Sequence, residues 1–194
     1  MSCPLVARVA RVWVGWQCGW QSSIGDCELD DDQTLTAYHE AGHAVIGYAL
    51  GGTVDSLQLG GEADDWLPDR FGDCRIHWGK VDPNCDWQRH REILTILAGP
   101  VAEMVYRGEM LHPAVYQPWQ DDWRRAWAAS EILTPNPERR GRLLEQMIGQ
   151  LADRIRCEPC WAAIAALADG LLAHEFLDRD QVAEILGFWL HESR

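Results

Sequence analysis

The chain has 194 residues, of which 47% are hydrophobic and 24% charged, an ordinary balance for one globular domain with a substantial core. Its formal net charge of −13 disfavours nucleic acid and anionic lipid surfaces as partners, so we expect no nucleic-acid binding. Seven cysteines, an odd number at irregular spacing, do not fit the disulfide framework of a small secreted protein and favour a reducing, cytoplasmic location.

The first 33 residues differ in composition from the rest of the chain. Residues 1–24 hold two arginines and no acidic residue, whereas acidic residues crowd into positions 26–32. We therefore expect an N-terminal extension, flexible or docking, before a single domain that spans residues 34–194. The segment Val6–Trp20 fits a short amphipathic helix or a weak signal-like sequence, but it lacks the small-residue cleavage site of a secreted protein.

A helix is predicted over Thr34–Gly52, because apolar residues recur near the 3.6-residue period and two glycines supply a stop signal. It carries the sequence His39-Glu40-Ala41-Gly42-His43. Histidines at i and i+4 lie on one helix face with Cβ atoms about 5–6 Å apart, so both imidazoles can bind one divalent metal. Glu40 is the candidate base that takes a proton from a water activated by the metal. We predict a zinc hydrolase site here; the alternative is a pair of ordinary core histidines.

Two short strands are predicted after this helix, at Thr53–Leu59 and Cys74–Trp78, separated by a loop rich in Gly, Asp and Pro. They would form a small sheet beside the motif, and by analogy with zinc peptidases an exposed strand edge is a candidate for holding an extended substrate backbone. The remaining elements expected are helices over Asp86–Arg107 (interrupted at Pro100), Trp119–Leu133, Glu138–Ile155, Trp161–Ala173 and Arg179–Leu190, the last opened by a capping box of Asp178 and Gln181. The expected fold class is mainly α with a small β-sheet (α+β).

Two further patterns are interpreted as structural. Cys157-Glu158-Pro159-Cys160 has the spacing of half a zinc site or of a redox pair, but the chain holds no second such pair. We interpret it as a helix start at Pro159 flanked by two half-buried thiols. The chain has 11 tryptophans, and Trp119, Trp123 and Trp127 recur every four residues, a stripe that predicts packing and implies no cofactor.

Several segments resemble one family in the same order. The stretch Thr36–Val45 resembles the zinc-binding helix of the peptidase domain of FtsH-type proteases, the membrane-bound AAA+ family. Leu97–Glu103 is similar to that family's Gly-Gly-Arg-Ala-Ala-Glu segment, and Gln120–Ala126 to its Asn-Asp-Leu-x-x-Ala segment. A weaker likeness to the closing helices runs over Trp161–Leu186, so that the resemblance covers about Thr34–Phe188.

The resemblance implies a third zinc ligand. A catalytic zinc usually has three protein ligands and an open position for water, so two histidines leave one donor missing. The family takes it from the Asp of its Asn-Asp-Leu segment, which corresponds to Asp122 here, with Asp121 in the Asn position. Asp121 is the alternative, and both carboxylates would also stabilise the start of a helix. Glu103 is either a partner that orients a metal-bound histidine or a plain helix-surface carboxylate.

The chain departs from the family pattern at several places. Pro100 replaces the usual Arg, and Trp127 stands where the family has a small hydroxyl residue, which leaves the metal donors intact but puts the substrate preference in doubt. No phosphate-binding Gly-x-x-x-x-Gly-Lys-Ser/Thr loop occurs, and Lys80 is the only lysine, so we expect no ATPase motor in this chain. The apolar run Val12–Trp20 is far shorter than the roughly 20 residues needed to cross a bilayer, so no integral membrane segment is predicted.

These observations lead to one principal hypothesis. We expect an ATP-independent zinc metalloendopeptidase with one zinc per chain, held by His39, His43 and Asp122, with Glu40 as the catalytic base, acting on peptides or unfolded proteins. The alternatives are a zinc-retaining binding or scaffold module with little turnover, against which the intact Glu40 argues, and a zinc hydrolase of a non-peptide amide. Substrate delivery by a partner chain and assembly into a homo-oligomer remain open.

Overall fold

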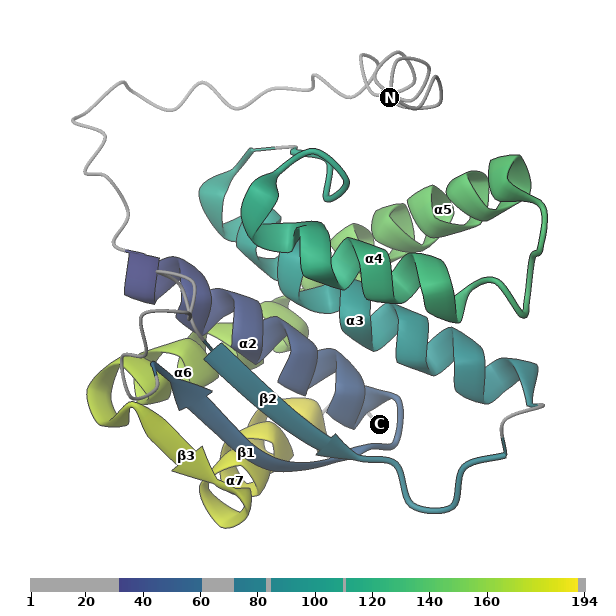
Figure 1. Cartoon of the computed structure of the whole chain (residues 1–194). Coiled ribbons are helices and arrows are strands. Elements are labelled where there is room, and N and C mark those ends of the chain that lie inside the picture. The colour runs from purple at the N-terminus through teal and green to yellow at the C-terminus, as the bar shows by residue number, and fades with distance from the viewer. Residues whose placement is uncertain (1–31, 61–71, 83–84, 110, 192–194) are drawn as a thin grey trace. The chain divides into compact units, whose positions relative to one another are not determined.

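The computed structural model describes residues 32–60, 72–82, 85–109 and 111–191, which belong to one compact unit running from Asp31 to Arg194 (Figure 1). The predictions for the first 31 residues and for the loop between the two predicted strands lie outside the described residues. Within the described ranges, the chain forms mainly helices and a single three-stranded antiparallel sheet, so the mainly α (α+β) prediction is confirmed. None of the helices in these ranges has the length and apolar character needed to span a membrane.

The elements follow one another along the chain in a simple order. They are α2 (Asp32–Ala49), β1 (Thr53–Leu59), β2 (Gly72–His77), α3 (Asp86–Arg107), the 3-10 turn η2 (Gln117–Trp119), α4 (Gln120–Ala129), α5 (Pro137–Ile155), α6 (Glu158–His174), β3 (Phe176–Asp178) and α7 (Arg179–His191). Helix α2 lies at the centre, where it packs against α3, α6 and the sheet (Figure 1). The helix that carries the motif is therefore supported on several sides.

Helix α2 approaches α3 closely because position 42 has no side chain. A Cβ on Gly42 would lie 2.5 Å from Ala102 Cβ and 2.7 Å from the Ala98 carbonyl oxygen, distances that force a shift in α3. The helix ends where Gly51 takes a φ of 89°, a left-handed conformation that glycine adopts without steric cost. The close contact presses the motif helix onto the segment of α3 that contains Leu97–Glu103.

The sheet has the order β2-β1-β3, with both neighbours antiparallel to β1 (Figure 1). A register shift between Val54 and Ser56 makes Asp55 the extra residue of a bulge. Because of this bulge, Val54 and Leu57 are both buried although they are an odd number of residues apart. β2 runs over Gly72–His77 instead of the predicted Cys74–Trp78, and the strand β3 was not predicted, since three residues are too few to show an alternation.

Helix α3 contradicts the predicted interruption at Pro100. It runs without a break from Asp86 to Arg107, with Pro100 inside it, and ends at Gly108 in the left-handed conformation. Proline removes one backbone hydrogen bond from the helix interior. The residues from Ile96 to Met104 are all buried. Their packing against neighbouring helices stabilises α3 and offsets the hydrogen bond that Pro100 removes.

The later helices agree with the prediction in position and differ at their ends. Helix α4 ends at Ala129, short of the predicted Leu133, and the Ser130 hydroxyl donates to the Trp127 carbonyl (2.9 Å) just past that end. The predicted capping box of α7 is confirmed: Asp178 Oδ1 accepts from the Gln181 backbone N–H, and Gln181 Oε1 accepts from the Asp178 N–H, both at 3.0 Å.

The Cys-x-x-Cys segment starts α6, as predicted, with a proline in the first helical positions. The expectation of two half-buried thiols was wrong, because Cys157 is exposed outside the helix and Cys160 is buried within its first turn. Burial raises the pKa of the Cys160 thiol to about 11.

Candidate metal centre

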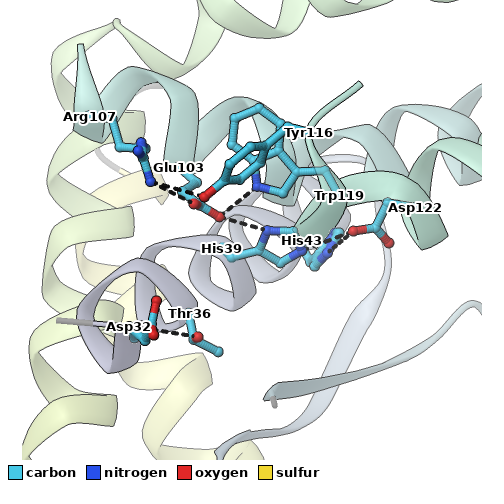
Figure 2. Close-up of polar contacts among 9 residues, drawn as sticks. All are labelled: Asp32, Thr36, His39, His43, Glu103, Arg107, Tyr116, Trp119 and Asp122. Atoms are coloured by element: carbon cyan, nitrogen blue, oxygen red, sulfur yellow. Dashed lines mark hydrogen bonds and ion pairs between the residues drawn. The ribbon is translucent and has the colours of Figure 1, made fainter. Parts of the chain in front are cut away.

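Three side chains from two helices bring metal-binding atoms to one point. Helix α2 presents His39 and His43 on the same face, and α4 presents Asp122 from its first turn. One donor atom from each of the three residues lies within 4.8 Å of the other two. Asp122 Oδ2 is 3.0 Å from His39 Nε2 and 3.8 Å from His43 Nε2 (Figure 2). The Nε2 atoms of both imidazoles therefore converge on the same carboxylate.

The other nitrogen of each imidazole has a partner of its own. His43 Nδ1 donates to the Thr95 carbonyl of α3 at 2.7 Å, which leaves the Nε2 lone pair available. His39 Nδ1 lies 3.4 Å from Glu103 Oε2, also on α3. Glu103 is 0% exposed, so the interpretation of Glu103 as a plain helix-surface carboxylate was wrong and the interpretation as a partner of a histidine agrees with the geometry. Such partners commonly fix the orientation of metal-binding histidines.

The four ionisable groups of the centre are shifted in different directions. Burial lowers the pKa of His43 to about 4. Burial also opposes a charge on His39, but its contacts with Asp122 and Glu103 outweigh burial and raise the His39 pKa to about 10. The pKa of Asp122 is lowered, because the two histidines outweigh the effect of burial on its carboxyl group. Burial raises the pKa of Glu40 to about 7, a value suited to proton transfer near neutral pH.

The two neighbouring aspartates face different surroundings. The Asp122 side chain is 11% exposed and lies at the histidines, and Arg125 Nη1 is 3.5 Å from its Oδ1. The Asp121 side chain is 82% exposed and pairs with Arg124 on the outer side of the same helix. The structure thus brings Asp122 to the predicted site and leaves Asp121 outside it.

Glu40 stands at the wall of an open groove of about 1020 Å³. The groove is lined by His39, Glu40 and His43 of the motif and by residues of β2, among them Gly72 and Asp73. Glu40 lies so close to the start of this strand that a Cβ on Gly72 would be 2.5 Å from Glu40 Oε1. The candidate base and the strand are therefore direct neighbours in the groove.

Two residues at the site were not predicted from the sequence. Gly99 of α3 faces the histidines, and a Cβ at this position would overlap His43 Nε2 and lie 2.7 Å from His39 Nε2. Trp119 is fully buried, and its indole N–H donates to Glu103 Oε2 at 2.7 Å. The packing expected of the tryptophan stripe holds for Trp119, and its indole also bonds a residue of the centre. Gly99 lies within the segment that resembles the family, which was the one available signal.

The donor set suits zinc. A tetrahedral zinc with ligand distances of roughly 2.0–2.2 Å places its ligand atoms about 3.3 Å apart. Asp122 Oδ2 lies 3.0 and 3.8 Å from the two imidazole Nε2 atoms, on either side of that value, and all three donor atoms lie within 4.8 Å of one another. Two imidazoles and one carboxylate form a typical catalytic donor set, which keeps one position for water. The residues present therefore fit the metal predicted from the sequence.

Comparison of the chain with protein-family models and with curated proteins finds no match.

Proposed function

We propose that this chain is a zinc-dependent metallopeptidase of the FtsH peptidase type. One observation carries the proposal: Nε2 of His39, Nε2 of His43 and a carboxylate oxygen of Asp122 converge within 4.8 Å, with Glu40 beside them on the wall of an open groove. The three donors and the base occupy the roles that zinc hydrolysis requires.

The arrangement of the resembling segments supports the family proposal. The segments Thr36–Val45, Leu97–Glu103 and Gln120–Ala126 lie far apart in the sequence and on three different helices. In the folded chain they meet at a single point: α2 provides the histidines, α3 provides Glu103 against His39, and α4 provides Asp122. If the three similarities had arisen by chance, the segments would not be expected to lie together in the folded chain.

In the proposed reaction each residue has one task. His39, His43 and Asp122 would hold the metal. Bound zinc would act as a Lewis acid: it would polarise the substrate carbonyl and lower the pKa of a water molecule, so that this water could lose a proton and attack near neutral pH. Glu40 takes the proton from the attacking water and passes it to the leaving amine. In the metal-free protein, burial raises the pKa of Glu40 to about 7, so the carboxyl group is divided between its two protonation states near neutral pH.

The groove favours an extended peptide as substrate. β2 pairs with β1 on one side, and along its other edge no strand of the described ranges is paired with it. The groove is lined by residues of β2 and the segment after it, among them Gly72, Cys74 and Trp78. An extended backbone added at this edge would pass beside Glu40, which touches the start of the strand. We therefore propose peptides and unfolded protein segments as the substrate class.

Cleavage of a casein-type unfolded protein tests this function. The zinc-loaded wild type should cleave it, a chelator should abolish cleavage, and added zinc should restore it. Glu40→Gln should keep zinc while hydrolysis falls by about 10²- to 10⁴-fold, because the variant loses the base but little volume. Glu138→Gln, at an exposed position of α5, is the matched control and should retain full activity. Zinc-loaded wild type that cleaves no unfolded protein or peptide pool would contradict the proposal.

A further inference from the structure

A buried tryptophan fixes the carboxylate that contacts His39. Trp119 is 0% exposed, and its Nε1 donates a 2.7 Å hydrogen bond to Glu103 Oε2. An indole has a single donor, and this one is directed at a carboxyl oxygen of Glu103. Since Glu103 is also 0% exposed, its protein neighbours set the orientation of its carboxylate.

The same carboxylate oxygen serves Trp119 and His39. Glu103 Oε2 lies 2.7 Å from the indole nitrogen and 3.4 Å from His39 Nδ1 (Figure 2). The other oxygen, Oε1, lies 3.7 Å from Arg107 Nη1, and that guanidinium also donates to the Tyr116 hydroxyl at 3.2 Å. The Tyr116 ring in turn meets the Trp119 ring edge to face, with centroids 4.6 Å apart. Glu103 is thus fixed through Oε2 by the indole hydrogen bond, while Oε1 makes a longer ion pair with Arg107.

Trp119 also occupies a position that matters for the third candidate ligand. It is the last residue of η2 and directly precedes α4, which carries Asp122 in its first turn. Its hydrogen bond therefore fastens the start of α4 to α3. The hydrogen bond from Trp119 to Glu103 thus connects the start of the helix that carries Asp122 with the residue that faces His39.

We propose that Trp119 is a positioning residue of the zinc site, which holds Glu103 against His39 and seats the start of α4 so that Asp122 meets both histidines. The inference rests on the proposed zinc site and adds a residue outside its ligands and base. Its consequence is specific: removing the indole N–H weakens zinc binding, while removing other tryptophans of the same stripe does not.

Trp119→Phe tests the inference, because it keeps an aromatic ring and removes the donor. Zinc affinity is measured by competition with a chromophoric chelator, at a temperature where each variant is fully folded. We expect affinity to fall by about tenfold or more, the scale seen when partners of metal ligands are lost. The visible absorption spectrum of the cobalt-substituted protein should change as well, since the ligand geometry relaxes. Trp127→Phe, in the same stripe but stacked under Arg140 (5.0 Å), is the control and should bind zinc like the wild type.

The outcomes separate this inference from the proposed function. Wild type that binds no zinc overturns both; wild-type affinity in a folded Trp119→Phe variant overturns the inference alone. If that variant does not fold, NMR on tryptophan-labelled wild type decides. The Glu103→Gln variant identifies the indole N–H resonance of Trp119, because the substitution shifts it. Zinc added to the wild type must move the same resonance, because a metal on His39 changes the interaction of the imidazole with Glu103 Oε2, which also accepts the indole hydrogen bond. A resonance that zinc leaves in place overturns the inference.

Discussion

Gly99 lies so close to His43 that a Cβ at position 99 would overlap the Nε2 atom of the imidazole. The same Cβ would be 2.7 Å from Nε2 of His39. These are the two nitrogens that converge on Asp122. At Gly99, α3 therefore presents backbone without a side chain beside the candidate metal position. The space that a side chain would fill is the space that a metal ion and its ligands need.

Gly99→Ala should therefore disrupt zinc binding. The added methyl group would displace one or both imidazoles, and we expect zinc affinity to fall by about 100-fold, measured by chelator competition. Gly149→Ala is the matched control, because Gly149 also lies inside a helix but a Cβ there meets nothing within 4 Å. That variant should bind zinc normally and gain about 0.5–1 kcal/mol of stability. Normal zinc binding by a folded Gly99→Ala protein would place the metal elsewhere.

The neighbouring aspartates should respond unequally to substitution. Asp122 contacts both histidines with a side chain that is 11% exposed, whereas the Asp121 side chain is 82% exposed and pairs with Arg124. We expect Asp122→Ala to lose zinc in chelator competition and Asp121→Ala to stay within about tenfold of wild type. The reverse order would move the third ligand to Asp121. Equal and small losses would mean that the third donor lies elsewhere in the chain.

Zinc binding should release a proton from His39. In protein stripped of metal at pH 8, His43 is neutral with a pKa of about 4, Asp122 is ionised, and His39 is protonated with a pKa of about 10. Zinc needs the neutral imidazole, so binding expels about one proton from the ligands. The apparent dissociation constant should therefore fall by about tenfold for each unit by which the pH rises toward the His39 pKa. Calorimetry in buffers of different ionisation enthalpy counts the protons. A heat of binding that does not depend on the buffer would contradict the ligand assignment.

The two thiols at the start of α6 should differ in reactivity. Cys157 is exposed, whereas Cys160 is buried and its pKa is raised to about 11, so only a small fraction of Cys160 is thiolate at pH 8. Iodoacetamide should modify Cys157 well before Cys160 in the folded protein, and peptide mapping by mass spectrometry measures both. Urea should equalise the two rates. Equal rates in the folded state would restore the interpretation of a reactive pair.

The parts of the site that sequence predicted well are those encoded locally. The spacing of His39 and His43 on one helix face follows from the 3.6-residue period, and Glu40 lies next to them for the same reason. The capping box at Asp178 is likewise a contact between near neighbours in the chain. Asp122, which lies on another helix, was reached through the family resemblance, since spacing alone left Asp121 as an alternative.

The parts that were missed depend on packing between distant segments. The break expected at Pro100 does not occur, because burial on both sides of the proline stabilises α3 against one lost hydrogen bond. The contact of Trp119 with Glu103 joins η2 to α3, and no periodicity encodes it. β3 forms because its residues meet β1 across the fold, with Leu57 opposite Leu177. These features become visible only once the helices are placed against one another.

The zinc content of the purified protein tests the proposed metal site. Elemental analysis should find about one zinc per chain in the wild type, because His39, His43 and Asp122 form one three-ligand site. The double variant His39→Ala/His43→Ala should contain almost none, while His90→Ala, which removes a histidine of α3 that lies outside this group, should keep full occupancy. Full zinc occupancy in the double variant would rule out His39 and His43 as the zinc ligands.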